Sequence, residues 1–354
     1  MSKPNIWIFS LEPLDSRYTA QWHKHIPNLL TTAAGDNFNV IQIDGTQRTT
    51  KVTSGAFLNF SDTNYWKSSQ LCNFVEFLDS GKVTPNDKFL FTDAWNPVIT
   101  QIAYMRDLLS QKWELHGIWH AGAYDPSDIL GYKMQKPWPW EAEKSWFYSL
   151  DYNYFASYFH MDLFLNNLHI PVTGYSKAKF SGQPYEYLIE ELGRYWDTPK
   201  DGNIIWPHRY NNDKQPAIIE DLGKDFNVII TQKLSLSKAE YYHRLGQASI
   251  NFSCSLHENL GVSVTEGVMA GVIPVVPDRC SYKEMYLPEF KYPSEWTTSV
   301  ANFKLYRAEL VEFINERIVN RDKYLDALKT QRDILNSKYL QAGVMIKNIT
   351  SLSI

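Results

Sequence analysis

The sequence predicts an α/β protein of two Rossmann-like domains, each built on a doubly wound parallel sheet. Short apolar, β-branched runs alternate with helical patterns along most of the chain. Short turns rich in Gly, Asp and Pro separate these runs, as is typical of such sheets. The chain has 354 residues, which at roughly 150 residues per domain corresponds to about two domains.

The first domain is expected over residues 1–198. Its strands and helices are expected, in order, at residues 5–11, 18–32, 39–43, 65–78, 88–91, 98–109 and 115–119. The alternation blurs in the unusually aromatic stretch 135–168, and residues 170–173 are expected to form the last strand. A helix at 185–195 then leads into the polar segment 197–202, whose Pro and Gly are typical of a linker.

The second domain is expected over residues 199–330, where the alternation resumes. Its strands are expected at residues 203–206, 226–231, 249–253 and 272–276, and the helices that follow at 238–246, 262–270, 300–319 and 322–340. Ser237 is expected to cap the helix after it, and Gly271 to end the helix before it. Residues 331–354 are expected to form a C-terminal helix. Two such halves predict a cleft between them, with ligands beyond the carboxyl ends of the strands.

Composition excludes several classes of protein. Hydrophobic residues make up 44% of the chain and charged residues 21%, which allows a large core and argues against disorder. No apolar run approaches the roughly 18 residues of a membrane span, and the apolar start reads as a strand rather than a signal peptide. Cys72, Cys254 and Cys280 are too far apart in sequence for a disulfide scaffold, which suits a reducing cytoplasm. A net charge of −4 disfavours non-specific coating of nucleic acid but permits a local basic patch.

The most informative part of the sequence is a predicted strand, tight loop and helix around Glu258. Asn259, Leu260 and Gly261 are expected to present backbone N–H groups at the helix N-terminus, where an anion such as phosphate is stabilised. Glu266 follows eight positions after Glu258. Two carboxylates that flank an anion site fit a ligand with a diphosphate in the middle and hydroxyls at both ends, as in a nucleotide sugar. Two ordinary surface carboxylates are the alternative interpretation.

A second segment supplies cations. Arg209 and Lys214 lie in the loop after the strand predicted at 203–206. Two cations at a strand carboxyl end can clamp a diphosphate and neutralise a leaving nucleotide, although they can also be plain surface residues. No Gly-x-Gly-x-x-Gly follows any predicted strand, which disfavours a nucleotide-cofactor dehydrogenase.

The segment from Glu258 through Glu266 to the Ile-Pro-Val-Val strand resembles the retaining GT-B glycosyltransferases with the E-x7-E motif. The resemblance implies that Glu258 contacts the donor sugar and Glu266 the ribose hydroxyls. It also implies that Arg209 and Lys214 bind the diphosphate, that the anomeric configuration is retained, and that the last helix packs back onto the first domain. No Asp-x-Asp, the metal-binding triplet of the other large glycosyltransferase fold, occurs in the chain, so no essential metal is expected.

A more specific motif, a His-Arg pair followed by Asp-Lys-x-Pro, resembles the branch of this family that mannosylates queuosine in tRNA. The loop after the first strand departs from the family, because it lacks the Gly-Gly pair that cradles the donor diphosphate. Arg17 or the Ser16 hydroxyl is expected to replace those backbone contacts, unless Asp15 or Ser16 merely caps the helix. This N-terminal wording resembles glycosyltransferases of tailed phages, some of which glycosylate modified bases in their own DNA.

Two side chains at predicted strand ends of the first domain are further candidates. His120 takes the place where the family often has a histidine beside the donor sugar, and the alternative is a structural, hydrogen-bonded histidine. Asp93 either contacts the acceptor or serves as a polar cap. Trp138 and Trp140 interleave with lysines and would stack a base extruded from a duplex, unless this stretch is a buried aromatic cluster.

Taken together, these resemblances imply a retaining glycosyltransferase that uses a nucleotide-diphosphate sugar, UDP- or GDP-linked. The expected acceptor is a hydroxymethylated pyrimidine in phage DNA, which would place the protein in the host cytoplasm. A queuosine tRNA, a small molecule or a glycan is the alternative acceptor, and a phosphate-releasing epimerase on the same fold is the runner-up enzyme class. A degenerate GT-B module that only binds nucleotide or nucleic acid is the non-enzymatic alternative. No membrane contact is expected, and no motif encodes the oligomeric state.

Overall fold

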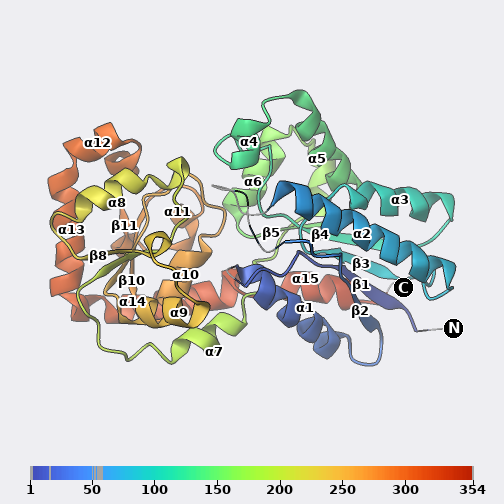
Figure 1. The fold of residues 1–354 in the computed structure, drawn as a ribbon, viewed down its shortest axis with the longest axis horizontal. Helices are drawn as coiled ribbons and strands as arrows, with labels where there is room; N and C mark the ends of the chain where they lie inside the picture. The colour runs from blue at the N-terminus through green and yellow to red at the C-terminus, as the bar shows by residue number, and fades with distance from the viewer. Residues whose placement is uncertain (1–2, 16, 50, 52, 54–58, 353–354) are drawn as a thin grey trace. The chain divides into compact units, whose positions relative to one another are not determined.

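The structure is a computed structural model that describes residues 3–15, 17–49, 51, 53 and 59–352 (Figure 1). The chain divides into two compact units. Unit 1 comprises Met1–Pro184 together with Ala342–Ile354, and unit 2 comprises Tyr185–Gln341. The polar segment 197–202, which the sequence suggests as a linker, lies inside unit 2.

Unit 1 is built on a six-stranded sheet with the order β2-β1-β3-β4-β5-β6, in which every neighbouring pair is parallel. Its strands are β1 (Asn5–Phe9), β2 (Asn39–Ile43), β3 (Lys88–Phe91), β4 (Glu114–Ile118), β5 (Tyr152–Phe155) and β6 (Ala178–Phe180). All five residues of β1 and all four of β3 are buried, because helices cover both faces of a parallel sheet.

The helices of unit 1 lie on both sides of its sheet (Figure 1). They are α1 (Tyr18–Ala34), α2 (Phe60–Asp79), α3 (Val98–Leu108), α4 (Ile129–Lys133), α5 (Pro137–Ser149), α6 (Tyr158–Asn167) and α15 (Gly343–Thr350), with a 3-10 helix at Val172–Lys177. Figure 1 shows α2, α3 and α5 in the upper part of unit 1 and α1 and α15 in its lower part. Lys88 Nζ donates to the carbonyl of Asn348 at 3.2 Å, which ties α15 to β3.

The end of unit 1 differs from the sequence prediction. Residues 170–173 are not the last strand; β5 and β6 are strands, and a 3-10 helix begins directly after Pro171. Proline has no N–H for a strand ladder, which accounts for the turn at this point. β5 is hidden in sequence because its Tyr-Asn-Tyr-Phe run lies in an aromatic stretch where strand and helix patterns look alike.

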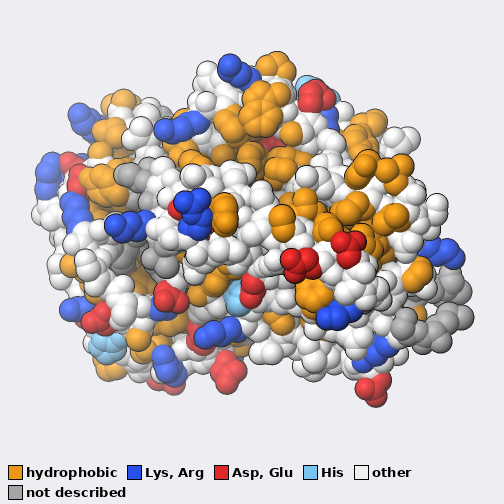
Figure 2. Space-filling view, turned by 45° about the vertical axis from the view of Figure 1, so that its right-hand side comes forward, with side chains coloured by type: hydrophobic (Ala, Val, Ile, Leu, Met, Phe, Trp, Pro, Cys, Tyr) orange, Lys and Arg blue, Asp and Glu red, His pale blue; other side chains and the backbone are white. Residues whose placement is uncertain are grey.

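Aromatic side chains of unit 1 are divided between core and surface. Trp146 and Phe147 of α5 are buried, as are Trp7 and Trp119. Exposed large side chains of unit 1 include Tyr104 and Leu108 of α3, Tyr132 of α4, and Trp138, Trp140 and Tyr148 of α5. Figure 2 shows hydrophobic side chains reaching the surface over the upper part of the view, the part that holds these three helices in Figure 1.

Unit 2 has a five-stranded parallel sheet with the order β11-β10-β9-β7-β8. Its strands are β7 (Ile204–Trp206), β8 (Val228–Ile230), β9 (Ile250–Phe252), β10 (Ile273–Pro277) and β11 (Lys291–Tyr292). Its helices are α7 (Tyr187–Gly193), α8 (Pro216–Leu222), α9 (Lys238–Gln247), α10 (Val262–Met269), α11 (Tyr282–Met285), α12 (Val300–Leu305), α13 (Arg307–Val319) and α14 (Leu325–Ile334), and Leu335–Tyr339 continues α14 as a π-helix.

Two helix ends that matter for the site follow the sequence. Ser237 caps α9 in a capping box with Glu240, so the predicted N-cap is confirmed. Gly271 follows α10 with φ +74°, and a Cβ there would lie 2.8 Å from the carbonyl oxygen of Trp196. The helix therefore ends where the sequence predicts. The helix predicted at 300–319 is instead two helices, α12 and α13, that meet at Tyr306, and α8 was not anticipated.

No helix in the part of the chain that the structure describes is long and apolar enough to cross a membrane.

Candidate active site

The candidate site of unit 2 lies at one edge of its sheet, where β7 and β9 end. These two strands are parallel neighbours, with Ile204 paired to Ile250. Their following loops therefore meet at the same edge. The loop after β7 carries Arg209 and Lys214, and the loop after β9 carries Glu258.

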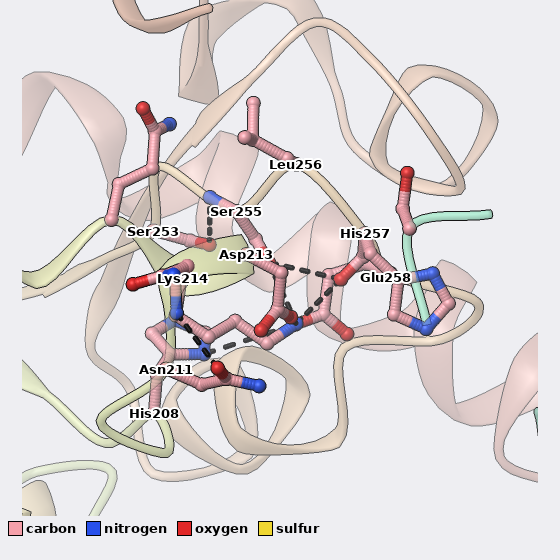
Figure 3. Close-up of polar contacts among 12 residues, drawn as sticks. His208, Asn211, Asp213, Lys214, Ser253, Ser255, Leu256, His257 and Glu258 are labelled. Carbon is pink, nitrogen blue, oxygen red and sulfur yellow. Dashed lines mark hydrogen bonds and ion pairs between the residues drawn. The ribbon is translucent and has the colours of Figure 1, made fainter. Parts of the chain in front are cut away.

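Lys214 is the centre of this site. Its ammonium donates hydrogen bonds to Ser255 Oγ at 2.7 Å, to the His257 carbonyl at 2.5 Å and to Glu258 Oε1 at 2.7 Å (Figure 3). Asp213 Oδ2 lies 3.2 Å from the same nitrogen. Only 5% of Lys214 is exposed, so its charge is compensated by protein groups rather than by water. The two loops are thereby joined through one cation.

Glu258 is held as a carboxylate. Its side chain is 14% exposed and lies 2.7 Å from Lys214 Nζ. Burial is the largest single influence and by itself would raise the pKa of this carboxyl. The charge and hydrogen bond of Lys214, together with the nearby His208 and His257, outweigh burial and hold the pKa below its ordinary value. A charged and mostly buried acceptor is suited to bind hydroxyl groups of a ligand.

His208 adds a neutral ring to this pair. Its Nδ1 lies 3.8 Å from Glu258 Oε1, and the residue is buried. Burial lowers the pKa of His208 to about 4, so the imidazole is uncharged at neutral pH. The ion pair of the site is therefore between Glu258 and Lys214, and His208 lines it without adding charge.

Arg209 brings a second cation with unused capacity. Among the described residues, its Nη1 is buried and has no hydrogen-bond partner. Buried guanidinium donors normally have partners, because leaving one unpaired costs about 1–3 kcal/mol. The group is therefore suited to bind an anionic ligand, as the sequence suggests.

The N-terminus of α10 lies in the same loop as Glu258. Gly261 precedes the helix with φ +72°, and its carbonyl accepts from the N–H groups of Val264 at 2.9 Å and Thr265 at 3.1 Å. A Cβ on Gly261 would lie 2.6 Å from Cε1 of Tyr282. Both the backbone conformation and the close packing therefore require glycine at this position. Leu260, which precedes it, is buried, as is Asn259.

Glu266 lies within α10, buried, and is surrounded by donors from α9. Lys238 Nζ donates to Oε1 at 2.9 Å, and the Tyr241 hydroxyl donates to Oε2 at 2.7 Å. The Tyr242 hydroxyl reaches Oε1 at 3.3 Å. Sequence reasoning missed these three partners, although the confirmed cap at Ser237 fixes where α9 begins and hence which face they share.

Arg279 and Gln215 hold the start of the loop that follows β9. Arg279 donates to the carbonyls of Cys254 and Ser255 at 2.8 Å each, and further bonds reach Thr297. Gln215, with φ +52°, donates to the Cys254 carbonyl at 2.6 Å. The carbonyls at the start of the loop are therefore satisfied, which holds the chain that leads to Glu258 in place. No motif singled out these two residues.

In unit 1, His120 lies just beyond the end of β4 as expected. Its Nε2 lies 2.8 Å from the carbonyl of Thr92, and Nδ1 lies 3.2 Å from the hydroxyl of Tyr18. Because a carbonyl only accepts, Nε2 carries the proton and Nδ1 accepts from the tyrosine. Burial lowers the pKa of His120, consistent with this neutral form.

Asp93 and Arg17 occupy different settings in unit 1. Asp93 Oδ2 accepts from Lys67 Nζ at 3.0 Å, and Oδ1 accepts from the Trp95 N–H at 3.1 Å. Arg17 is the N-cap residue of α1 but makes no capping bond through its side chain. Ser16 lies outside the described residues, so its predicted role stays a prediction.

The two tryptophans proposed for acceptor contact are both exposed, Trp138 at 56% and Trp140 at 38%. Trp140 also has a structural bond, since its Nε1 donates to the carbonyl of Ala123 at 2.8 Å. The aromatic stretch is thus part core and part surface. Among the residues the structure describes, no group of three His, Cys, Asp or Glu side chains is arranged to hold a metal ion.

Comparison with solved structures decides the fold. Sucrose-phosphate synthase from Thermosynechococcus elongatus superposes with a TM-score of 0.60 at 10% identity, over 98% of this chain and 97% of that one. Anabaena HepE in complex with UDP and glucose superposes with a TM-score of 0.59 at 11% identity, over 98% of both chains. An alpha,alpha-trehalose-phosphate synthase from Burkholderia vietnamiensis superposes with a TM-score of 0.59 at 10% identity, over 99% of both chains. The chain has the GT-B glycosyltransferase fold. The predicted fold class is confirmed.

Sequence comparison reaches less of the chain. No protein family profile matches it. A tRNA-queuosine alpha-mannosyltransferase of Drosophila melanogaster is 25% identical over 170 residues, which cover 38% of this chain. The match spans 45% of the length of that relative.

Proposed function

We propose that the protein is a retaining glycosyltransferase that uses a nucleotide-diphosphate sugar. One observation carries the proposal. The Lys214–Glu258 ion pair, the unpaired buried nitrogen of Arg209 and the N-terminus of α10 all belong to two loops that end neighbouring strands of unit 2. Cations and helix N–H groups suit a diphosphate, and the carboxylates suit the hydroxyls at either end of the ligand.

In this proposal, each residue has a defined task. Arg209 and the backbone at Asn259–Gly261 bind the diphosphate, and the positive charge of Lys214, whose three donors are used within the site, helps to stabilise the charge that grows on the diphosphate as it leaves. Glu258 accepts hydrogen bonds from the sugar. Glu266, held by the α9 tyrosines and Lys238, accepts from the ribose hydroxyls. His120 stays neutral, and in this role a sugar hydroxyl takes the place of the Tyr18 hydroxyl as donor to its Nδ1.

The reaction balances without a strong protein base. The bond between the anomeric carbon and the diphosphate oxygen breaks, and a bond from the acceptor hydroxyl forms on the same face of the sugar. The acceptor proton passes to the departing diphosphate, which leaves as the nucleoside diphosphate. We expect no metal to be essential, because Arg209 and Lys214 supply the positive charge.

For the acceptor we propose a hydroxyl on a modified nucleic-acid base. The resemblance of the sequence after the first strand to phage glycosyltransferases favours a hydroxymethylated pyrimidine in phage DNA. Trp138 and Trp140 offer exposed rings on which a base could stack. The match to a tRNA-queuosine alpha-mannosyltransferase favours tRNA as the second candidate. Asp93 would contact the acceptor in either case, and either acceptor places the reaction in the cytoplasm.

The test incubates the protein with a panel of nucleotide sugars and hydroxymethylpyrimidine DNA, bulk tRNA or no acceptor, and reads the nucleosides by mass spectrometry. A hexose or pentose mass on a DNA base is the expected result. Mass on tRNA alone would replace the DNA acceptor by tRNA. Release of nucleoside diphosphate without a modified base would reject a nucleic-acid acceptor, and no release with any donor would reject the enzyme. Glu258→Gln should abolish turnover, while Lys224→Met, an exposed cation of the same unit, should not.

A further inference from the structure

A buried carboxylate in unit 1 binds the loop that follows β4. Glu143 of α5 is fully buried. Its Oε1 accepts from the Ala123 N–H at 2.5 Å, and its Oε2 accepts from the Tyr124 N–H at 3.0 Å. Trp140, one turn earlier on the same helix, donates to the carbonyl of Ala123 at 2.8 Å. One helix therefore holds both the N–H and the carbonyl of the same residue.

The same carboxylate also reaches the loop after β3. Trp95 Nε1 donates to Glu143 Oε1 at 3.0 Å. The carbonyl of Trp95 accepts from Lys67 Nζ at 2.5 Å, and this lysine also pairs with Asp93. Lys67 is buried on α2, so the loops after β3 and β4 are joined through charged groups that water hardly reaches.

The local sequence is adapted to this contact. A Cβ on Gly122 would lie 2.5 Å from Glu143 Oε1 and 2.6 Å from Cε1 of Tyr124. Glycine at this position is therefore what lets the carboxylate approach the two N–H groups. A buried carboxylate is costly unless its oxygens are bonded, and here three N–H donors meet it.

We infer that Glu143 and Trp140 are positioning residues for the carboxyl edge of the unit 1 sheet. They fix the loop at residues 119–124, which carries His120, and through Trp95 they fix the loop that carries Asp93. Both His120 and Asp93 are candidates for contact with sugar or acceptor, so this inference rests on the proposed function. Glu143 does not need to touch the substrate for this role, and Trp140 acts in it through its Nε1 rather than through its exposed ring, because these bonds go to the backbone and to Trp95.

The test compares Glu143→Gln and Trp140→Phe with Glu114→Gln in the full chain. The amide of Gln cannot accept at its nitrogen, and Phe keeps an aromatic ring without the N–H donor. Glu114 is the matched control, since it is a carboxylate at the opposite end of β4 and pairs with Lys88 at 2.8 Å. Amide hydrogen exchange of residues 119–125 reports the loop, and steady-state kinetics report KM for donor and acceptor separately.

Both test variants should speed exchange of the loop amides at least about tenfold and lower kcat/KM for the acceptor by about tenfold, with KM for the donor changed less than about twofold. Glu114→Gln should lower the melting temperature but leave both readouts at wild-type values. Unchanged exchange in Glu143→Gln, or faster exchange with unchanged acceptor kinetics, would overturn the inference. If the wild type transfers no sugar at all, the proposed function fails, and the exchange data alone decide whether Glu143 fixes the loop.

Discussion

The Lys214→Met variant tests how much the ion pair between Lys214 and Glu258 contributes to the stability of the protein. Wild-type Lys214 is 5% exposed, and its ammonium donates three hydrogen bonds and faces the Glu258 carboxylate. Methionine fills similar space but leaves that carboxylate buried without its cation. Removing one partner of a buried ion pair costs about 3–5 kcal/mol, so we expect a loss of about 4 kcal/mol in the free energy of unfolding. That is a large share of the roughly 5–15 kcal/mol of a typical domain.

The double variant Lys214→Met with Glu258→Gln provides the decisive comparison. The Glu258→Gln change replaces the carboxylate by a neutral amide, so the unpaired charge that dominates the single variant is gone. We expect the double variant to be more stable than Lys214→Met alone by about 2 kcal/mol, although both lack activity. Urea titrations at constant m-value measure the difference. Equal destabilisation of the single and double variants would refute the assignment of the ion pair.

Three further predictions use other contacts. Gly261→Ala places a Cβ 2.6 Å from Tyr282 at φ +72°. Nucleoside diphosphate should therefore bind at least about tenfold more weakly, as measured by calorimetry. Unchanged affinity would exclude the N-terminus of α10 from the site. Burial raises the pKa of Glu143 from 4.5 to about 7. The stability of the wild type relative to Glu143→Gln should therefore fall as pH rises from 4.5 to 7, and the loss should reach about 3 kcal/mol above pH 7. Parallel pH profiles of the two proteins would contradict this shift. Lys238→Met should weaken binding of a ribonucleotide about tenfold but of its 2′,3′-dideoxy analogue much less, and equal losses would remove Glu266 from ribose binding.

Sequence reasoning reached those features that depend on local order along the chain. The strand, loop and helix around Glu258 were predictable because the pattern changes from apolar strand to helix within a few residues. The loop after β7 followed from the same rule, since parallel strands end at one edge. That Lys214 bonds Glu258 directly was not predictable, because the two lie 44 residues apart in sequence and only the strand order brings them together.

Features without a local pattern were missed or mistaken. Glu143 bonds backbone N–H groups 19 and 20 residues away, which no motif records. The sequence predicts the last strand of unit 1 at 170–173, where an Ile-Pro-Val run is apolar, but proline ends a strand ladder rather than joins one. The aromatic stretch was ambiguous for a different reason: aromatic residues favour both strand and core, so their number says little about which side chain is exposed.

The return of α15 to unit 1 has a consequence for synthesis of the chain. Residues 185–341, the whole of unit 2, leave the ribosome before α15 does. Until then, α1 lacks the helix that packs beside it, and the buried Lys88 ammonium lacks the Asn348 carbonyl. Chains grow from the N-terminus and early domains usually fold first. Here unit 1 can be completed only after unit 2 has been made, because the buried Met345 and Ile349 of α15 reach it last.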